Sequence, residues 1–192
     1  MIVSIASGKG GTGKTSVVAS LSRGRAVIAD CDVDAPDLHL ILDPHIRETR
    51  EFHGISRAVI DPARCSGCLS CEEHCRYGAI HDLKVDPLAC EGCGVCRLVC
   101  PSEAVEMVDR LSGLAYVSET RYGPLVHAEL FPGEEASGRL VAMVREMARG
   151  LASSMELDLV LIDGSPGIGC PVVASLTGSQ PGPSCERAHD LW

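Results

Sequence analysis

Aromatic and basic residues are both scarce in this sequence of 192 residues. Phe, Trp and Tyr make up 3% of it, whereas hydrophobic residues of all kinds make up 45%, which suits the aliphatic core of an α/β protein. Lys and Arg number 17 against 26 Asp and Glu, so the net charge is −9. Because such a surface repels phosphate backbones and anionic lipids, we expect neither nucleic acid nor a membrane as a partner.

Two kinds of segment are also missing from the sequence. No apolar run approaches the roughly 20 residues that a membrane-spanning helix needs. The N-terminus has no charged stretch followed by an apolar one, because Met1 leads directly into the strand-like sequence Ile-Val-Ser-Ile-Ala. We therefore expect a cytoplasmic protein. In that setting 11 cysteines indicate metal binding, whereas in a secreted protein they would indicate disulfides.

The pattern of apolar segments predicts an α/β fold with a doubly wound, mostly parallel sheet. Residues 2–6 form a short apolar strand, and a glycine-rich stretch separates them from a helix at Thr15–Ser22. A second apolar strand, 26–29, leads into Asp30-Cys31-Asp32, and a third, 157–163, ends in an acid. Alternation of strand, loop, helix and strand is typical of the start of such a sheet.

The region after the cysteines has weaker but readable patterns. Residues 105–108, 115–118 and 125–130 alternate like strands, and Ser112-Gly113 and Tyr122-Gly123-Pro124 are predicted to be turns between them. A helix follows, and its apolar positions fall on one face that should pack against the core. These positions are Leu140, Val144, Met147 and Leu151.

Residues 8–15 fit the phosphate-binding pattern G-x-x-x-x-G-K-[ST], and they lie between a strand and a helix as that motif requires. Its glycines let backbone amides approach phosphates, and the helix N-terminus favours negative charge. Lys14 would reach the β- and γ-phosphates, and the Thr15 hydroxyl would bind Mg²⁺. The predicted nucleotide-binding residues are Gly8, Lys9, Gly10, Gly11, Thr12, Gly13, Lys14, Thr15 and Ser16.

A dinucleotide-binding fold is the alternative, because Gly8, Gly10 and Gly13 also fit G-x-G-x-x-G and an acid, Asp30, follows at a suitable distance. Two features favour the phosphate-binding loop. The Lys-Thr pair after the last glycine has no role in a dinucleotide site. Asp163, at the end of an apolar strand, is typical of the Walker B acid that acts on Mg²⁺.

With its second lysine, Lys9, the loop resembles the deviant Walker A motif of the MinD/ParA/nitrogenase-iron-protein family. In that family the extra lysine reaches the phosphates of the partner subunit, so the resemblance implies a homodimer through the nucleotide face, with Lys9 and Lys14 catalytic. Asp30-Cys31-Asp32 is similar to the family's switch segment. This implies that Asp32 orients the attacking water and that Asp30 lies near Mg²⁺. The alternative is that both aspartates only cap a strand.

From about residue 61 to 103 cysteines replace the aliphatic runs, in two copies of C-x2-C-x2-C-x3-C. This is the spacing of bacterial two-cluster ferredoxins, in which the fourth cysteine of each run ligates the other cluster. Zinc sites instead pair C-x2-C units that are a dozen or more residues apart, and they remain the alternative, with plain thiols. The expected [4Fe–4S] ligands are Cys65, Cys68, Cys71 and Cys100 for one cluster, and Cys90, Cys93, Cys96 and Cys75 for the other. Cys31, Cys170 and Cys185 lie outside the pattern. Cys31 and Cys170, which are close to the nucleotide motifs in sequence, are expected to be small buried thiols.

Together these motifs resemble MinD-superfamily ATPases with an inserted ferredoxin domain. The resemblance implies that residues 1–59 and 105–177 form a discontinuous ATPase domain around an α+β insert at 60–104. It also implies ATP, Mg²⁺ and two [4Fe–4S] clusters as cofactors, and a redox or iron–sulfur protein as partner. Nucleotide state would then be coupled to electron or cluster transfer. The alternatives are a positioning ATPase with structural clusters, and an inactive fragment in which only the ferredoxin module works.

The sequence after Asp163 is shorter than the resemblance implies. It offers one helix-like stretch, 172–176, and then a tail, 178–192, with two prolines and few apolar residues. We expect an irregular tail, a sheet that is incomplete on its C-terminal side, and an open aliphatic edge beside the Asp163 strand. ATP affinity should be weaker than the intact motifs suggest.

Overall fold

A computed structural model describes residues 1–22, 25–134 and 138–179, in two compact units. One unit, the sheet unit, contains Met1–Phe52 and the residues from Gly113 onward. The other, the cysteine unit, is His53–Ser112. It is wider at both ends than the expected 60–104, because the two strands that flank the cysteines pair with each other. Of the expected tail, positions 180–192 lie outside the described residues.

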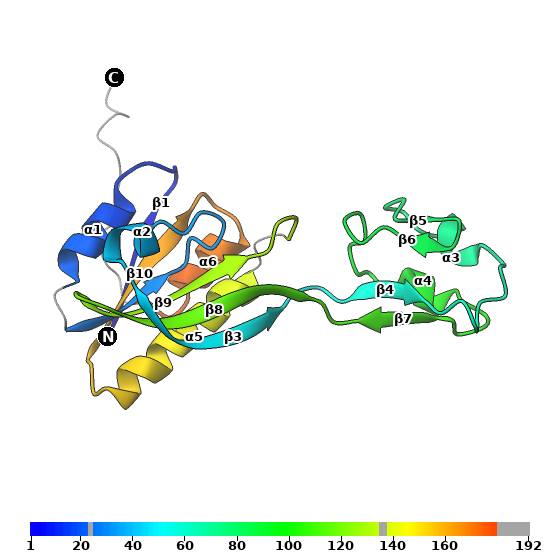
Figure 1. Ribbon diagram of the computed structural model, residues 1–192. Coiled ribbons are helices and arrows are strands. Elements are labelled where there is room, and N and C mark those ends of the chain that lie inside the picture. The colour runs from blue at the N-terminus through cyan, green and yellow to red at the C-terminus, as the bar shows by residue number, and fades with distance from the viewer. Residues whose placement is uncertain (23–24, 135–137, 180–192) are drawn as a thin grey trace, which may run out of the picture. The chain divides into compact units, whose positions relative to one another are not determined.

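The sheet unit is built on six strands in the order β1-β10-β2-β9-β8-β3 (Figure 1). Four neighbours, β1, β10, β2 and β9, run parallel, and β8 is antiparallel to β9. The predicted mostly parallel sheet is therefore compatible with the structure. In chain order the strands are β1 Ile2–Ser7, β2 Ala26–Asp30, β3 His45–His53, β8 Leu111–Thr120, β9 Gly123–Leu130 and β10 Leu159–Pro166.

Helices cover both faces of this sheet because successive strand residues point to opposite sides. On one face α1 (Lys14–Leu21) and α2 (Leu38–Leu42) pack against Ile28 and Leu161. On the other face α5 (Gly138–Ser154) packs against Val27 and Ile162, and α6 (Cys170–Leu176) lies against α5. Leu140, Val144 and Met147 of α5 are buried and Leu151 packs beside them, which confirms the predicted apolar face. Within the described parts of the chain, no helix has the length and apolar character needed to cross a membrane.

The predicted turn at Ser112-Gly113 is wrong, since both residues lie inside β8. A Cβ on Gly113 would come within 2.5 Å of the Glu129 carbonyl oxygen, so this glycine permits close approach of the neighbouring strand. The other predicted turn, Tyr122-Gly123-Pro124, is present but begins earlier: the chain reverses at residues 121–122, and Gly123 already belongs to β9.

The edge strand beside the strand of Asp163 is β1, where the open edge was expected. The strand of Asp163, β10, is interior, between β1 and β2. Among the described residues β1 pairs on one side only, and α6 packs nearby, where the Ser4 hydroxyl donates to the Ser175 carbonyl oxygen (2.8 Å). Arg145 of α5 holds the end of α6 by donating to the carbonyl oxygens of Ala174 (2.5 Å) and Thr177.

The cysteine unit contains two small antiparallel sheets and two short helices. Strand β4 pairs with β7, and β5 pairs with β6. Their bounds are β4 Arg57–Ile60, α3 Ser70–Glu73, β5 Ile80–His81, β6 Lys84–Val85, α4 Val95–Leu98 and β7 Val105–Val108. The predicted strand at 105–108 is confirmed, but it belongs to this unit. Two of the cysteines, Cys71 and Cys96, are buried in its core with Ala58, Ile80 and Val105.

Candidate functional site

The glycine-rich loop connects β1 to the N-terminus of α1. Gly11 (φ 70°) and Gly13 (φ 91°) adopt left-handed backbone conformations that glycine accepts without strain. A Cβ placed on Gly8, Gly10 or Gly13 would meet no atom within 4 Å, so the space beside these residues is open. The local geometry therefore leaves room for a ligand against the backbone of the loop.

Ser7, which no sequence motif identifies, holds this loop by hydrogen bonds. Ser7, the last residue of β1, donates its hydroxyl to the Lys9 carbonyl oxygen (2.7 Å) and accepts from the Thr12 hydroxyl (2.9 Å). The Ser7 carbonyl oxygen also accepts from the Gly167 amide after β10 (3.2 Å). No motif contains Ser7, so only the fold identifies it.

Two buried aspartates lie side by side next to the loop. Asp30 ends β2 and pairs in register with Asp163 of β10, and both are 1% exposed. The Asp30 carboxylate accepts from the amides of Asp32 (3.1 Å) and Leu38 (3.2 Å). Asp163 is hydrogen-bonded to the side chain of Thr15, but its Oδ1 is buried without a hydrogen-bond partner.

The pKa values of the acids at this site are raised above their ordinary range. Burial raises the pKa of Asp30 to about 8, and the charge of Asp163 adds to the rise. Burial also raises the pKa of Asp163, and it raises the pKa of Asp32 to about 6 against the opposing effect of Lys14. Since an orphaned buried oxygen and crowded carboxylates are both stabilised by a hard cation, the residues present fit Mg²⁺.

The structure thus brings together Lys14, Thr15, Asp30, Asp32 and Asp163. Lys14 is buried, and its charge acts on Asp32 and Asp163. The other predicted loop residues lie on the outside: Gly8, Lys9, Gly10, Gly11, Gly13 and Ser16 are exposed, and Thr12 is half-buried. In the described ranges no three His, Cys, Asp or Glu side chains converge closely enough to hold a single metal ion.

The cysteines of the second run surround a cavity together with one cysteine of the first run. Cys90, Cys93 and Cys96 line it, and the fourth thiol in its wall is that of Cys75. Cys71 of the first run is near Cys65 and also near Cys100 of the second run, whose charges add to the effect of burial in raising the pKa of the Cys71 thiol. Cys68 is exposed.

An internal repeat explains this crossed grouping. Residues 25 positions apart, such as Cys65 and Cys90, take equivalent places in the two copies, and several of their backbone contacts match. The Asp61 carboxylate accepts from the Ala63 amide and that of Asp86 from the Leu88 amide, both at 2.9 Å. The start of each repeat is also bonded to the end of the other: the Asp61 amide donates to the Ala104 carbonyl oxygen (2.8 Å) and the Asp86 amide to that of Ala79 (2.7 Å).

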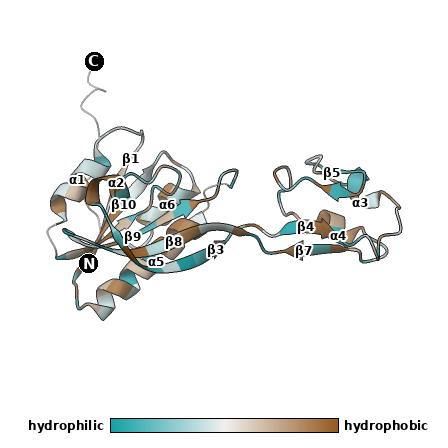
Figure 2. Ribbon diagram, in the orientation of Figure 1, coloured by the Kyte–Doolittle hydropathy of each residue, from teal (hydrophilic) through white to brown (hydrophobic). Residues whose placement is uncertain are grey.

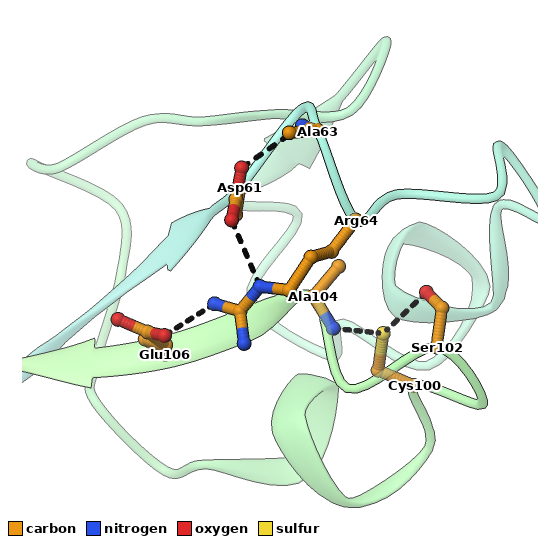
Figure 3. A network of polar contacts seen from close by, with 7 residues as sticks. All are labelled: Asp61, Ala63, Arg64, Cys100, Ser102, Ala104 and Glu106. Carbon is orange, nitrogen blue, oxygen red and sulfur yellow. Dashed lines mark hydrogen bonds and ion pairs between the residues drawn. The ribbon is translucent and has the colours of Figure 1, made fainter.

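The last cysteine of each run receives a matching backbone hydrogen bond. The Ala79 amide donates to the Cys75 sulfur (3.3 Å), and the Ala104 amide to the Cys100 sulfur (3.2 Å). Beside Cys100, Arg64 forms ion pairs with Asp61 (2.8 Å) and Glu106, and so ties the loop after β4 to β7 (Figure 3). Such donors and fixed loops suit sulfur ligands that carry negative charge.

The cysteines outside the runs differ from each other. Cys31 is buried, as expected, between Asp30 and Asp32, but Cys170 at the start of α6 is exposed, so the expectation of a buried thiol is wrong there. Cys185 lies outside the described residues.

Sequence matching identifies the cysteine unit. Residues 58–81 and 83–106 each match the 4Fe-4S binding domain family. This segment is an iron–sulfur module of the ferredoxin type. The chain is also 36% identical, over 182 residues, to an uncharacterized protein of Methanocaldococcus jannaschii. The alignment covers 92% of this chain, and therefore both units, but 63% of the relative.

A buried histidine in the sheet unit was not identified from the sequence. The His127 ring on β9 lies 5.0 Å from the Tyr116 ring and 6.1 Å from the stacked His39 ring, and its Nε2 is 3.2 Å from the Ser118 hydroxyl. Burial, and then the charge of His39, lowers its pKa from the ordinary 6.5 to about 4.

We expect this imidazole to stay neutral at pH 5 and to titrate near pH 4 in NMR spectra. As pH falls, the histidine of the unfolded chain takes up a proton near pH 6.5, whereas His127 of the folded chain does so only near pH 4. The contribution of neutral His127 to the stability of the fold is therefore complete above pH 6.5 and is lost as pH falls towards 4. His127→Gln should therefore show a smaller loss of stability across that window, whereas His45→Gln, at an exposed position, should match the wild type. Titration of His127 near 6.5 would contradict the prediction.

Proposed function

We propose that this chain is a P-loop ATPase of the MinD/ParA type whose nucleotide state controls electron transfer through two [4Fe–4S] clusters. The observation that carries the ATPase part is the buried Asp163 Oδ1, which has no hydrogen-bond partner and lies next to Thr15 and Lys14 at an open glycine-rich loop. A buried acceptor left in this state is costly unless a cation or ligand completes it. The iron–sulfur module in the same chain supplies the redox part.

Residues of the loop and of the neighbouring strands β2 and β10 would have separate roles in binding and hydrolysing a nucleoside triphosphate. Thr15, Asp30 and Asp163 would hold Mg²⁺, which supplies charge neutralisation at the phosphates when bound. Lys14 would pair with the β- and γ-phosphates, and the amides of the loop would donate to their oxygens. Asp32 is half-buried and can accept a proton or hydrogen bond from a water molecule near the γ-phosphate. Lys9 would act on the nucleotide of a second copy, which makes the active form a homodimer.

In the iron–sulfur module the proposed ligand sets are the crossed ones. Cys75, Cys90, Cys93 and Cys96 already line one cavity, and Cys65, Cys68, Cys71 and Cys100 would hold the other cluster. Each cluster supplies a site for one electron when it is bound. The amides of Ala79 and Ala104, which donate to cysteine sulfur, stabilise the thiolate ligands. A redox protein is the proposed partner.

Stopped-flow oxidation of the reduced holoprotein tests the coupling. Protein isolated without oxygen is reduced with dithionite and mixed with a one-electron acceptor dye in the presence of Mg²⁺ and either ATP, ADP or neither. We expect the oxidation rate to differ between ATP and ADP by at least about fivefold, a typical coupling between sites. The Lys14→Ala variant, loaded with iron equally, should show no difference. Equal rates in the wild type would contradict the coupling and favour an ATPase with structural clusters.

A further inference from the structure

The internal repeat allows a direct comparison between the surroundings of the two cluster sites. Around the first site lie three serines: Ser66 and Ser70 flank Cys68, and Ser102 follows Cys100. Cys65 and Cys90 are 25 positions apart, so the equivalent residues around the second site lie 25 positions after Ser66 and Ser70 and 25 positions before Ser102. They are Glu91, Val95 and Tyr77, and all three line the cavity of the second cysteine set.

The serines act on the sulfur atoms of the first set. The Ser102 hydroxyl lies 3.6 Å from the Cys100 sulfur (Figure 3), and the side chains of Ser70 and Ser66 are hydrogen-bonded to the Cys68 thiol. The backbone donors to Cys75 and Cys100 are matched between the sites. The hydroxyl groups of Ser66, Ser70 and Ser102 are therefore one difference between the first site and the second.

The second site has a different character at the same positions. The Val95 side chain cannot donate a hydrogen bond, and Tyr77 places an aromatic ring where Ser102 has a short hydroxyl. Glu91 brings a negative charge, and the guanidinium of Arg76, 5.6 Å from the centre of the Tyr77 ring, brings a positive one. The hollow next to Cys100 has balanced charges, with Arg64 and Arg97 against Glu103 and Glu106. The charged residues lining that hollow therefore add no net charge beside the first site.

The hydroxyl groups beside the first set of sulfur atoms affect its reduction potential in one direction. Adding an electron makes a cluster more negative, so hydrogen bonds to its sulfur ligands favour reduction, while a nearby carboxylate opposes it. On the basis of the proposed two-cluster function, we propose that the cluster held by Cys65, Cys68, Cys71 and Cys100 has the higher potential and takes the first electron. An electron donated to the other cluster then passes to this one, so the second cluster returns to its oxidised form as the first is reduced. The external source is a one-electron donor protein, or dithionite in vitro.

An anaerobic redox titration followed by EPR tests this order on the full chain. Iron and sulfide analysis first shows whether both clusters are present, and the Cys100→Ala and Cys75→Ala variants assign the two signals. We expect the first cluster to be reduced first in the wild type. Ser102→Ala should shift the partition of the first electron towards the second cluster by about tenfold, which is about 59 mV for one electron. The double variant Ser66→Ala/Ser70→Ala should act likewise.

Two further variants complete the test. Ser154→Ala, on the exposed end of α5, should leave both potentials unchanged, and Glu91→Ser/Val95→Ser should raise the potential of the second cluster alone. If both clusters are present but the second is reduced first, or if the serine variants leave the partition unchanged, the inference is wrong and the proposed function stands. If iron and sulfide are absent, both fail.

Discussion

The Cys100→Ala variant is expected to lose the cluster that binds mainly to the first cysteine run, although Cys100 belongs to the second. The reason is a hydrogen bond between the two repeats: the Asp61 amide donates to the Ala104 carbonyl oxygen, so the end of the second run lies next to the start of the first. The wild type should contain about eight irons and eight sulfides per chain, and the variant about half of each. Chemical analysis and EPR of protein purified without oxygen would measure this.

Cys170→Ala is the matched control, because Cys170 is an exposed cysteine on α6, outside both runs. It should keep all its iron. Stoichiometric zinc without labile sulfide in the wild type would exclude clusters altogether. Loss of the second-run cluster in Cys100→Ala, with the first intact, would show that each run supplies all four ligands of its own cluster.

The Lys14→Ala variant is expected to lose ATP hydrolysis by a factor on the order of 100 or more, because Lys14 is the buried cation beside the two acids of the site. Nucleotide binding should weaken as well, since the positive charge facing the β- and γ-phosphates is gone. Phosphate release measures the first effect and calorimetry the second. The Lys84→Ala variant, in the other unit, should behave as the wild type in both assays.

The Lys9→Ala variant distinguishes the role of Lys9 from that of Lys14. We expect it to retain nucleotide binding but to lose hydrolysis, since its proposed target is the nucleotide of a second copy. The oligomeric state with ATP is measured in parallel by light scattering. A strictly monomeric protein that hydrolyses ATP equally well with and without Lys9 would rule out the shared site.

The parts of the fold that the sequence predicts are those specified by neighbouring residues. Buried strands such as β2 and β10 are continuous aliphatic runs, and the cysteine spacing is a local signal. By contrast β3 was not predicted: it is rich in charged residues, exposed except for Phe52, and coloured largely as hydrophilic in Figure 2. Its partner β8 specifies it, and that pairing joins residues far apart in the chain. Gly113 was misread for the same reason, because the strand that it must accommodate comes later.

At the candidate site, too, the features set by neighbouring residues are predictable from the sequence, and those set by distant residues are not. The loop glycines, Lys14 and Thr15 are visible as a motif, and Asp163 follows from its strand. The in-register pairing of Asp30 with Asp163, and the orphaned oxygen that results, follow only from the order of the strands. Ser7 and His127 have no motif, because their roles come from contacts with residues distant in sequence. Their surroundings could not have been read from the chain alone.

The neighbouring positions of β3 and β8 in the sheet have an evolutionary consequence. The chain leaves the sheet unit from one of these strands and returns to it through the other, so the whole iron–sulfur module replaces what would otherwise be the loop of a hairpin. Adjacent strands lie about 4.8 Å apart, a gap that a turn of two residues can close. A module in this place can be gained or lost by a single insertion or deletion event, without changing the order of the strands that hold Asp30 and Asp163.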